Sequence, residues 1–245
     1  INGGASKIST NSFSNNSALK EVYINAGADE IEEYAFANDE ALTIFEMASG
    51  DAKILGDYVF DGDKALTTVT ISPTVSEIGI RPFKGCEKLA DVSFSGSPYY
   101  KCNNAIVYKL INGTEATIVQ CLEARGNSVG SSTVNKNEIP ATVATIADEA
   151  FMDCKNLAMV DFTGVPYTIT VGAKAFKNCT DLVTIDLPAA KSIGQLAFDG
   201  CKSLSRFEIK AGTERVEDYC FVNCTALTEI VIPQSVTMAV VNVLI

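Results

Sequence analysis

Apolar residues recur along the chain in columns that repeat every 22–25 residues. A phenylalanine marks position 0 of each unit: Phe13, Phe36, Phe60, Phe83, Phe151, Phe176, Phe198 and Phe221. One interval of 68 residues, between Phe83 and Phe151, equals about three periods. In all eight units a leucine stands at position +6, and apolar side chains stand at positions −5, +9 and +11. Chance does not produce five such columns, so the sequence contains an internal repeat.

The spacing within one unit predicts its secondary structure. The pattern Leu-x-x-Val-x-Ile at positions +6 to +11 alternates with period two and predicts a short strand entered from a turn. The segments before each phenylalanine, such as 31–36, 193–198 and 216–221, are predicted to form short helical or 3₁₀ turns. A unit of this size cannot bury its apolar side alone, so we expect the units to stack on one another.

Position +3 carries small residues and most of the cysteines. In chain order the column reads Asn16, Asp39, Asp63, Cys86, Cys154, Cys179, Cys201 and Cys224. We interpret it as a buried ladder of small side chains, because a free cysteine behaves as a small hydrophobe. Metal ligation is disfavoured, since a ladder spreads thiolates along a line instead of converging them on a point. Disulfides between rungs remain an alternative with strained geometry.

Residues 96–138 fit no register of the repeat. Two apolar runs flank Asn112-Gly113, a dipeptide that favours a two-residue hairpin turn. Cys102 and Cys121 lie outside the +3 column and could pair across the base of this hairpin. The insert either extends the sheet or protrudes as a binding loop, for which Tyr99, Tyr100 and Tyr108 are the candidate contacts. The sequence leaves both alternatives open.

The columns resemble the BspA-like, or type-5, leucine-rich repeats. The most similar segments are IPATVATIADEAFMDCKNL at 139–157 and IGQLAFDGCKSL at 193–204, and VIPQSV at 231–236 repeats the opening phrase. The resemblance covers residues 8 to about 95 and 139 to about 237. It implies a repeat solenoid: a right-handed leucine-rich-repeat-like coil with short parallel strands on one face, short helical or 3₁₀ turns on the other, and a β-hairpin insert. We expect residues 1–245 to form a single leucine-rich-repeat domain.

Composition and charge then narrow the function. The formal net charge of −11 disfavours nucleic acid as a partner. The chain has no histidine, which removes Ser-His-Asp and Cys-His catalysis and histidine-ligated metals. The Walker loop, the dinucleotide fingerprint and C-x-x-C are also missing, so we predict no enzyme, no catalytic residues, no cofactor and no metal site. No stretch is long and apolar enough for a transmembrane helix.

Positions +8 and +10 of each unit should point outward from the strand. There, seven acidic residues accompany one basic residue. The candidate partner-binding residues on this strand face are Glu21, Tyr23, Glu46, Asp91, Asp161, Asp186, Arg206, Glu208 and Glu229. Asp161, Asp186 and Glu208 should stack at about 4.8 Å, an unfavourable arrangement of like charges. The face is either ordinary solvated surface or a binding surface for a basic partner, with weak divalent cation binding as a further alternative.

The resemblance implies a cell-surface or secreted interaction and adhesion module of bacterial type, binding a protein or glycan, such as a host matrix protein, through the strand face. The alternatives are a structural spacer in a larger envelope protein and a polysaccharide-handling accessory protein. We expect a monomer that reaches the surface after removal of an N-terminal signal, because the sequence begins with Ile1.

Overall fold

The computed structural model describes residues 6–25, 28–47, 52–126, 132–236 and 238–239. The chain forms two compact units. Unit 1 comprises residues 1–113 and 122–124, and unit 2 comprises residues 114–121 and 125–245. Each unit is a stack of repeat coils, which confirms the predicted solenoid. The last residue of the predicted repeats, 237, lies outside the described residues.

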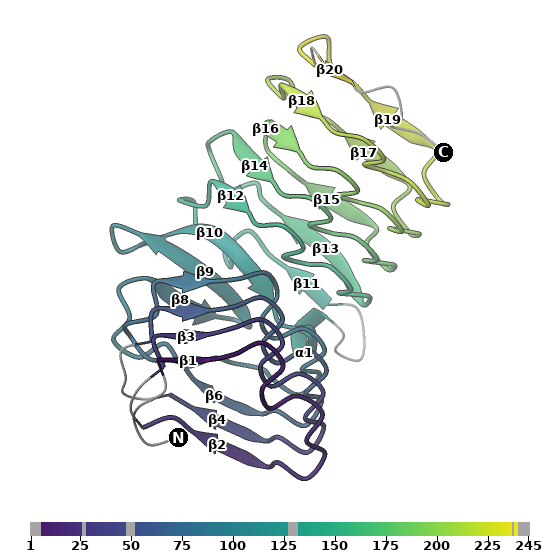
Figure 1. Ribbon diagram of the computed structural model, residues 1–245. Helices are drawn as coiled ribbons and strands as arrows, with labels where there is room; N and C mark the ends of the chain where they lie inside the picture. Colours follow the sequence, from purple (N-terminus) through teal and green to yellow (C-terminus); the bar gives the residue numbers. More distant parts are fainter. Residues whose placement is uncertain (1–5, 26–27, 48–51, 127–131, 237, 240–245) are drawn as a thin grey trace. The chain divides into compact units, whose positions relative to one another are not determined.

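Unit 1 contains two parallel sheets and one antiparallel pair. The first sheet consists of β1 (Lys7–Ile8), β3 (Glu30–Ile31), β5 (Ile54–Leu55) and β7 (Glu77–Ile78). The second consists of β2 (Glu21–Tyr23), β4 (Ile44–Glu46) and β6 (Thr68–Thr70), which lie in successive layers (Figure 1). The antiparallel pair is β8 (Tyr100–Asn103) and β9 (Ile106–Ile111).

Unit 2 repeats this arrangement of strands. One series of parallel strands contains β10 (Thr114–Cys121), β12 (Thr145–Ile146), β14 (Ile169–Val171), β16 (Ala190–Ile193), β18 (Arg215–Val216) and β20 (Met238–Ala239). The other strands are β11 (Ser132–Val134), β13 (Leu157–Asp161) and β15 (Thr184–Asp186) in one sheet, and β17 (Arg206–Glu208) and β19 (Glu229–Val231) in another. The helix α1 spans Glu123–Gly126.

Most coils therefore have two strands, where the sequence predicted one, and in the coil of Phe83 the second strand is reduced to an isolated bridge at Ser93. The predicted strand at positions +8 to +10 is present in both units. The additional strand ends at position −5. A single apolar residue at this position indicates burial, but it does not by itself indicate a strand. It is often only two residues long, as in Glu30–Ile31, and such a segment shows no period-two alternation.

The phenylalanines at position 0 form the centre of each core. In unit 1 the rings of Phe36 and Phe60 stack with centroids 5.9 Å apart, and in unit 2 those of Phe176 and Phe198 stack at 5.2 Å. The leucines at position +6 are fully buried from Leu42 to Leu204. Phe13, which has a ring stacked on only one side by Phe36, is 37% exposed. The apolar columns are thus the core that the repeat predicts.

The segments before each phenylalanine are hydrogen-bonded turns, and the expected helical or 3₁₀ turns are not formed there. Alternate amides donate to the neighbouring coil: Tyr34 N–H to the carbonyl of Asp57 at 3.1 Å, and Phe36 N–H to that of Val59 at 3.0 Å. The amide of Ala35, between them, donates within its own coil to Glu32. A helix cannot send alternate amides to a neighbour, because it uses them all internally.

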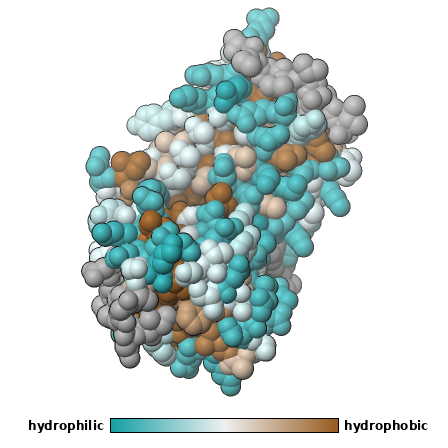
Figure 2. Space-filling view, in the orientation of Figure 1, coloured by the Kyte–Doolittle hydropathy of each residue, from teal (hydrophilic) through white to brown (hydrophobic). Residues whose placement is uncertain are grey.

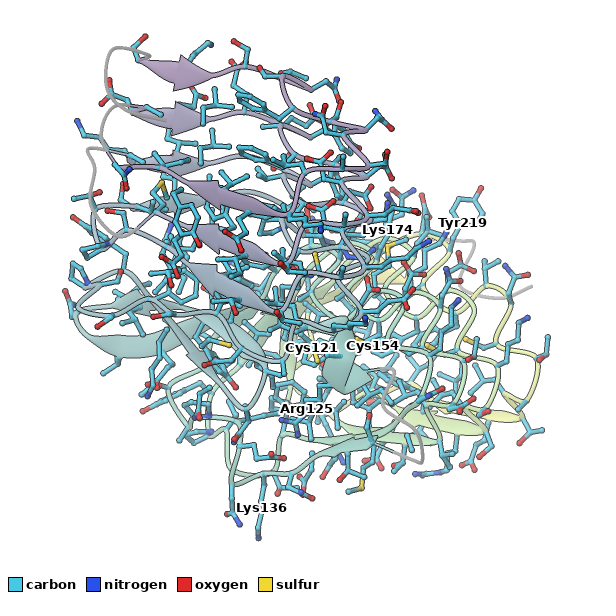
Figure 3. All side chains as sticks on the ribbon, turned by 90° about the horizontal axis from the view of Figure 1, so that it is seen from below. Cys121, Arg125, Lys136, Cys154, Lys174 and Tyr219 are labelled. Atoms are coloured by element: carbon cyan, nitrogen blue, oxygen red, sulfur yellow. The ribbon has the colours of Figure 1, made fainter. Side chains whose placement is uncertain are left out.

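Left-handed residues shape these turns. The residue at position −2 has a positive φ in each of the eight repeats, from Asn11 (φ 58°) to Tyr219 (φ 58°), although this residue is never a glycine. Position +2 also has a positive φ, and there the chain uses residues that tolerate this conformation: Asn15, Asn38, Gly62, Gly85, Asp153, Asn178, Gly200 and Asn223. Tyr219 projects away from the ribbon (Figure 3).

The insert contains strands at both predicted apolar runs, β9 and β10. Asn112 and Gly113, between them, have φ of 52° and 78°, as a type I′ turn requires. A second hairpin was not predicted: β8 pairs with β9 through Asn104 and Ala105, which also have positive φ. Cys102 and Cys121 are free thiols, as are the other six cysteines, so the structure contains no disulfide between them.

Candidate functional site

Strands β2, β4 and β6 place the predicted face residues of unit 1 in rows. One row joins Glu21, Ile44 and Thr68, and the other joins Tyr23, Glu46, Thr70 and, through an isolated bridge, Ser93. The central residues of these strands are buried, so their neighbours point outward. We define the unit 1 strand face as Glu21, Tyr23, Ile44, Glu46, Thr68, Thr70, Asp91 and Ser93.

The carboxylates of the unit 1 strand face lack cationic partners. The Tyr23 hydroxyl donates a hydrogen bond to Glu21 Oε2 at 3.2 Å. Partial burial, followed by this hydrogen bond, raises the pKa of Tyr23 above its ordinary value. Glu46 and Asp91 form no ion pair with any residue that the structure describes. The face therefore carries negative charge that the described residues of unit 1 do not neutralise.

A hollow of about 310 Å³ lies at the edge of this face. Asp91 and Ser93 line it together with the core residues Val92 and Phe94 of the same repeat and with residues of the insert: Ser97, Tyr100, Lys101, Cys102 and Leu110. The Ser97 hydroxyl oxygen accepts the amides of Tyr99 at 3.1 Å and Tyr100 at 3.2 Å, which fixes this wall. The hollow thus joins strand-face and insert residues in one site with a carboxylate, hydroxyl groups and an exposed lysine.

The strand face of unit 2 has the same rows but a different charge balance. Asp161 and Asp186 are register partners, as are Arg206 and Glu229. Glu208 pairs with Val231, and β15 and β17 belong to different sheets, so a continuous hydrogen-bonded ladder of Asp161, Asp186 and Glu208 is not formed. We define the unit 2 strand face as Met159, Asp161, Thr184, Asp186, Arg206, Glu208, Glu229 and Val231.

Cations neutralise most of the acidic residues on the unit 2 strand face. Lys210 Nζ lies 3.4 Å from Asp186 Oδ1 and 3.3 Å from Glu208 Oε1. Arg206 contacts Glu208 at 3.4 Å and Glu229 at 3.1 Å. The hydrogen bond from Lys210 keeps the pKa of Glu208 below its ordinary value. Sequence reasoning missed Lys210, which stands at position +12, two residues beyond the strand.

Asp161 is stabilised locally. Its Oδ1 accepts the amide of Thr163 at 2.9 Å, and this hydrogen bond is the main reason that the pKa of Asp161 lies below its ordinary value. Lys136 adds a weaker electrostatic contribution from an exposed position, where it projects from the ribbon (Figure 3). Every acidic candidate of unit 2 therefore has a donor or cation nearby.

The three insert tyrosines have different environments. Tyr99 is 40% exposed, whereas Tyr100 is 2% exposed and Tyr108 is fully buried. The Tyr100 hydroxyl accepts the amide of Ile78 at 3.0 Å and donates to the carbonyl of Ser76 at 3.4 Å, which satisfies the free edge of β7. Tyr100 and Tyr108 thus serve the packing of the insert, and Tyr99 presents its ring to solvent.

The cysteines of the +3 column are buried hydrogen-bond donors. The thiols of Cys86, Cys179, Cys201 and Cys224 donate to the carbonyl of the phenylalanine in the preceding coil at 3.0–3.2 Å. Burial raises the pKa of the Cys224 thiol to about 11 and that of Cys86 well above its ordinary value. These groups are therefore thiols at neutral pH, not thiolate nucleophiles or ligands.

The described part of the chain holds no cluster of three or more potential metal-ligating side chains. It also contains no helix with the length and apolar character that a membrane crossing requires. In Figure 2 hydrophobic residues form several separate patches among hydrophilic ones on the visible face.

Stacked coils with alternating buried and exposed strand residues define a repeat protein of the leucine-rich type. A family model described as a BspA type leucine-rich repeat region matches six copies over residues 1–112 and 126–243. The chain therefore belongs to the BspA-type leucine-rich repeat family. A comparison with curated proteins finds no significant sequence match.

Three solved structures share the fold. A leucine-rich cell surface protein from Faecalibacterium prausnitzii A2-165 is 24% identical, with a TM-score of 0.68 over 93% of this chain and 63% of that one. The pneumococcal vaccine antigen PcpA is 15% identical, with a TM-score of 0.64 over 83% and 53%. A leucine-rich repeat protein from Eubacterium ventriosum ATCC 27560 is 19% identical, with a TM-score of 0.60 over 89% and 71%. The chain thus spans 63% and 53% of the lengths of the first two.

Proposed function

We propose that this chain is a non-catalytic interaction module displayed on a bacterial cell surface, and that the unit 1 strand face binds a protein partner bearing basic residues. Two of the similar solved structures are described as a cell surface protein and a vaccine antigen, which supports a surface location. Repeat solenoids commonly bind partners along such exposed strand faces.

The contrast between the two strand faces is the observation that carries this proposal. Glu46 and Asp91 have no cationic partner among the described residues, whereas Arg206 and Lys210 neutralise the carboxylates of unit 2. Uncompensated charge on a rigid surface attracts a partner of opposite sign and accelerates its association. A basic protein segment fits the unit 1 strand face for this reason.

The hollow beside Asp91 offers a site for one side chain of the partner at the edge of the unit 1 strand face. A lysine or arginine side chain of the partner that enters it would meet the Asp91 carboxylate and the Ser93 hydroxyl and would pass the aliphatic Leu110, while the exposed Lys101 also lines the hollow. The exposed threonine Thr68 and half-buried Thr70 supply further hydrogen-bonding groups along the rows. A glycan would use the same hydroxyl groups, and it is therefore the second ligand class to test.

A structural spacer is the second candidate function. Its support comes from unit 2, where Arg206 and Lys210 pair with acidic residues of the same face and leave little charge for a partner. In this case the stacked coils would hold another part of the protein away from the cell envelope. The two functions predict different results when the carboxylates of the unit 1 strand face are removed: an interaction module loses affinity for its partner, and a spacer does not.

A binding screen on immobilised matrix proteins and glycans separates these functions. The test variant Glu21→Gln/Glu46→Gln/Asp91→Asn removes the three carboxylates of the unit 1 strand face. The matched control Asp161→Asn/Asp186→Asn/Glu208→Gln removes three charges from unit 2. We expect the test variant to lose about tenfold in affinity for a basic protein, from three exposed charges that each contribute below about 1 kcal/mol.

The control variant should bind within about twofold of the wild type, because its carboxylates are already paired. The wild-type affinity should also fall as salt is raised, and added calcium should have little effect. Equal affinities for the two variants, or a ligand that is an uncharged glycan, would contradict the assignment to a basic partner. Absence of binding to every probe would favour the spacer.

A further inference from the structure

Two fully buried carboxyl groups continue the +3 column of unit 1. Asp39 and Asp63 are each 0% exposed, and they stand in successive coils between Asn16 and Cys86. They lie away from the strand face and play no part in the proposed partner binding. A buried carboxyl group needs a hydrogen-bond partner for both of its oxygens or must be neutral.

One oxygen of each carboxyl group accepts an amide from the preceding coil. Asp39 Oδ1 accepts the amide of Asn16 at 2.6 Å, and Asp63 Oδ1 accepts that of Asp39 at 2.7 Å. The other oxygens, Asp39 Oδ2 and Asp63 Oδ2, are buried without a hydrogen bond. Each carboxyl group is thus satisfied on one side only.

This arrangement also leaves a backbone carbonyl unpaired. From Asp63 onward the amide at +3 donates to the phenylalanine of the same coil, as Cys179 does to Phe176 at 3.2 Å. The amide of Asp39 donates to Asp63 instead. As a result, no donor among the described residues bonds to the carbonyl oxygen of Phe36.

The thiols of the same column show which group can donate to this carbonyl. One coil further along, Cys86 Sγ donates to the carbonyl of Phe60 at 3.2 Å. The residue in the equivalent relation to Phe36 is Asp63. Two acceptor oxygens cannot bond to each other unless one carries a proton.

We propose that Asp63 is a neutral carboxylic acid in the folded protein and that its Oδ2–H donates to the carbonyl oxygen of Phe36. This hydrogen bond joins two neighbouring coils of unit 1 and is lost when Asp63 is deprotonated, and we call it the pH-sensitive joint. Asp39 repeats the arrangement one coil earlier. There the carbonyl of Phe13 already accepts a hydrogen bond from the Asn16 side chain, so the proton of Asp39 is less important.

The surrounding charges favour the neutral form. Asp39 faces Asp63 from the preceding coil, Asp61 lies in the same coil, and the Cys86 thiol lies in the next one. The nearby cations are engaged elsewhere: Lys84 contacts Asp61 at 2.7 Å, and Arg81 contacts Glu123 of α1 at 2.7 Å. Among the residues that the structure describes, no cation therefore compensates an ionised Asp63.

The direction of titration agrees with this geometry. Burial, opposed by the bond from the Asp39 amide, raises the pKa of Asp63 to about 8. Burial, opposed by the Asn16 amide, raises that of Asp39 to about 6. Because the folded protein then binds more protons than the unfolded chain, unit 1 loses stability as pH rises from the ordinary aspartate pKa of 3.8 towards these raised values.

Carboxyl carbon chemical shifts of the full chain, followed by NMR from pH 4 to pH 10, test the proposal directly. The shift assigned to Asp63, identified by its loss in Asp63→Asn, should titrate with a midpoint near pH 8. A midpoint below pH 7 would overturn the proposal, because the carboxyl group would then be ionised in the neutral folded protein.

Hydrogen exchange gives a second readout, corrected for intrinsic exchange rates. Between pH 7 and pH 9 the opening of unit 1 coils should increase about tenfold, as expected for a group that titrates near the middle of this range. Asp63→Asn, whose side-chain amide both donates and accepts, should abolish this increase. The control Asp61→Asn should retain it. A pH dependence that persists in Asp63→Asn, or one that also vanishes in Asp61→Asn, would contradict the joint.

Discussion

The two units place different chemical groups at the same position of the same repeat. Unit 2 has thiols at +3, as in Cys179 and Cys201, while the early coils of unit 1 have Asn16, Asp39 and Asp63. A thiol donates weakly to a neighbouring carbonyl and costs little to bury. A carboxyl group accepts an amide from the preceding coil and must stay protonated to avoid a buried charge. The same packing position therefore makes one unit sensitive to pH and leaves the other insensitive.

The strand faces differ in a parallel way. The carboxylates of unit 2 are matched by Arg206 and Lys210, while Glu46 and Asp91 of unit 1 are not matched within the described residues. Both comparisons show that the repeat specifies the backbone and the apolar core of both units. Residues outside the apolar columns, at position +3 and on the strand faces, set the charge and the protonation of each unit separately.

The largest expected effect concerns a feature that the units share. Phe60→Ala in unit 1 and Phe176→Ala in unit 2 should each cost about 3–5 kcal/mol, because each removes a fully buried ring stacked between two others. Urea unfolding with hydrogen exchange, which locates the loosened coils, measures this loss. A clearly smaller cost at one site would show that the two cores are not equivalent.

A column swap gives the next largest effect. Cys179→Asp places a carboxyl group in the unit 2 column and should destabilise that unit by about 1–3 kcal/mol, because one acceptor is left unsatisfied when the group is ionised. The folded pKa of the new group is raised, so the loss should be small near pH 4 and grow as pH rises. Stability curves at pH 5 and pH 9 measure it.

Cys179→Ser is the matched control for the swap, because its hydroxyl can still donate to the carbonyl of Phe151 that the thiol contacts at 3.0 Å. It should show no such pH dependence. A loss in Cys179→Asp that is independent of pH would mean that the carboxyl group reaches solvent, and the comparison between the columns would then fail.

Much of the fold follows from the sequence because the core columns are strictly periodic. The leucines at +6 and the alternating strand at +8 to +10 predict stacked repeat units, and the family resemblance then implies the solenoid. The left-handed conformation at position +2 was not predicted, although that position holds only asparagine, aspartate or glycine, which tolerate it. The same left-handed conformation at position −2 could not be predicted. Tyr58, Lys174 and Leu196 adopt it there, and none of these residue types is typical of a positive φ.

The site was less predictable because it depends on contacts between coils. Lys210 lies outside the strand pattern, yet its long side chain reaches two carboxylates. Tyr100 and Tyr108 are buried because β8 pairs with β9, and the short turn at Asn104 that allows this pairing lacks a glycine. The unpaired oxygens at Asp63 and Phe36 arise from a redirected amide, which no single position of the sequence reveals.

The most direct test of the proposed function is a hydrogen-exchange footprint of the full chain with a bound basic protein partner from the binding screen. The account predicts that protection will be confined to β2, β4, β6 and the residues around Asp91, and that β13, β15, β17 and β19 will exchange as in the free chain. Protection centred on the unit 2 strands, with those of unit 1 unchanged, would contradict it.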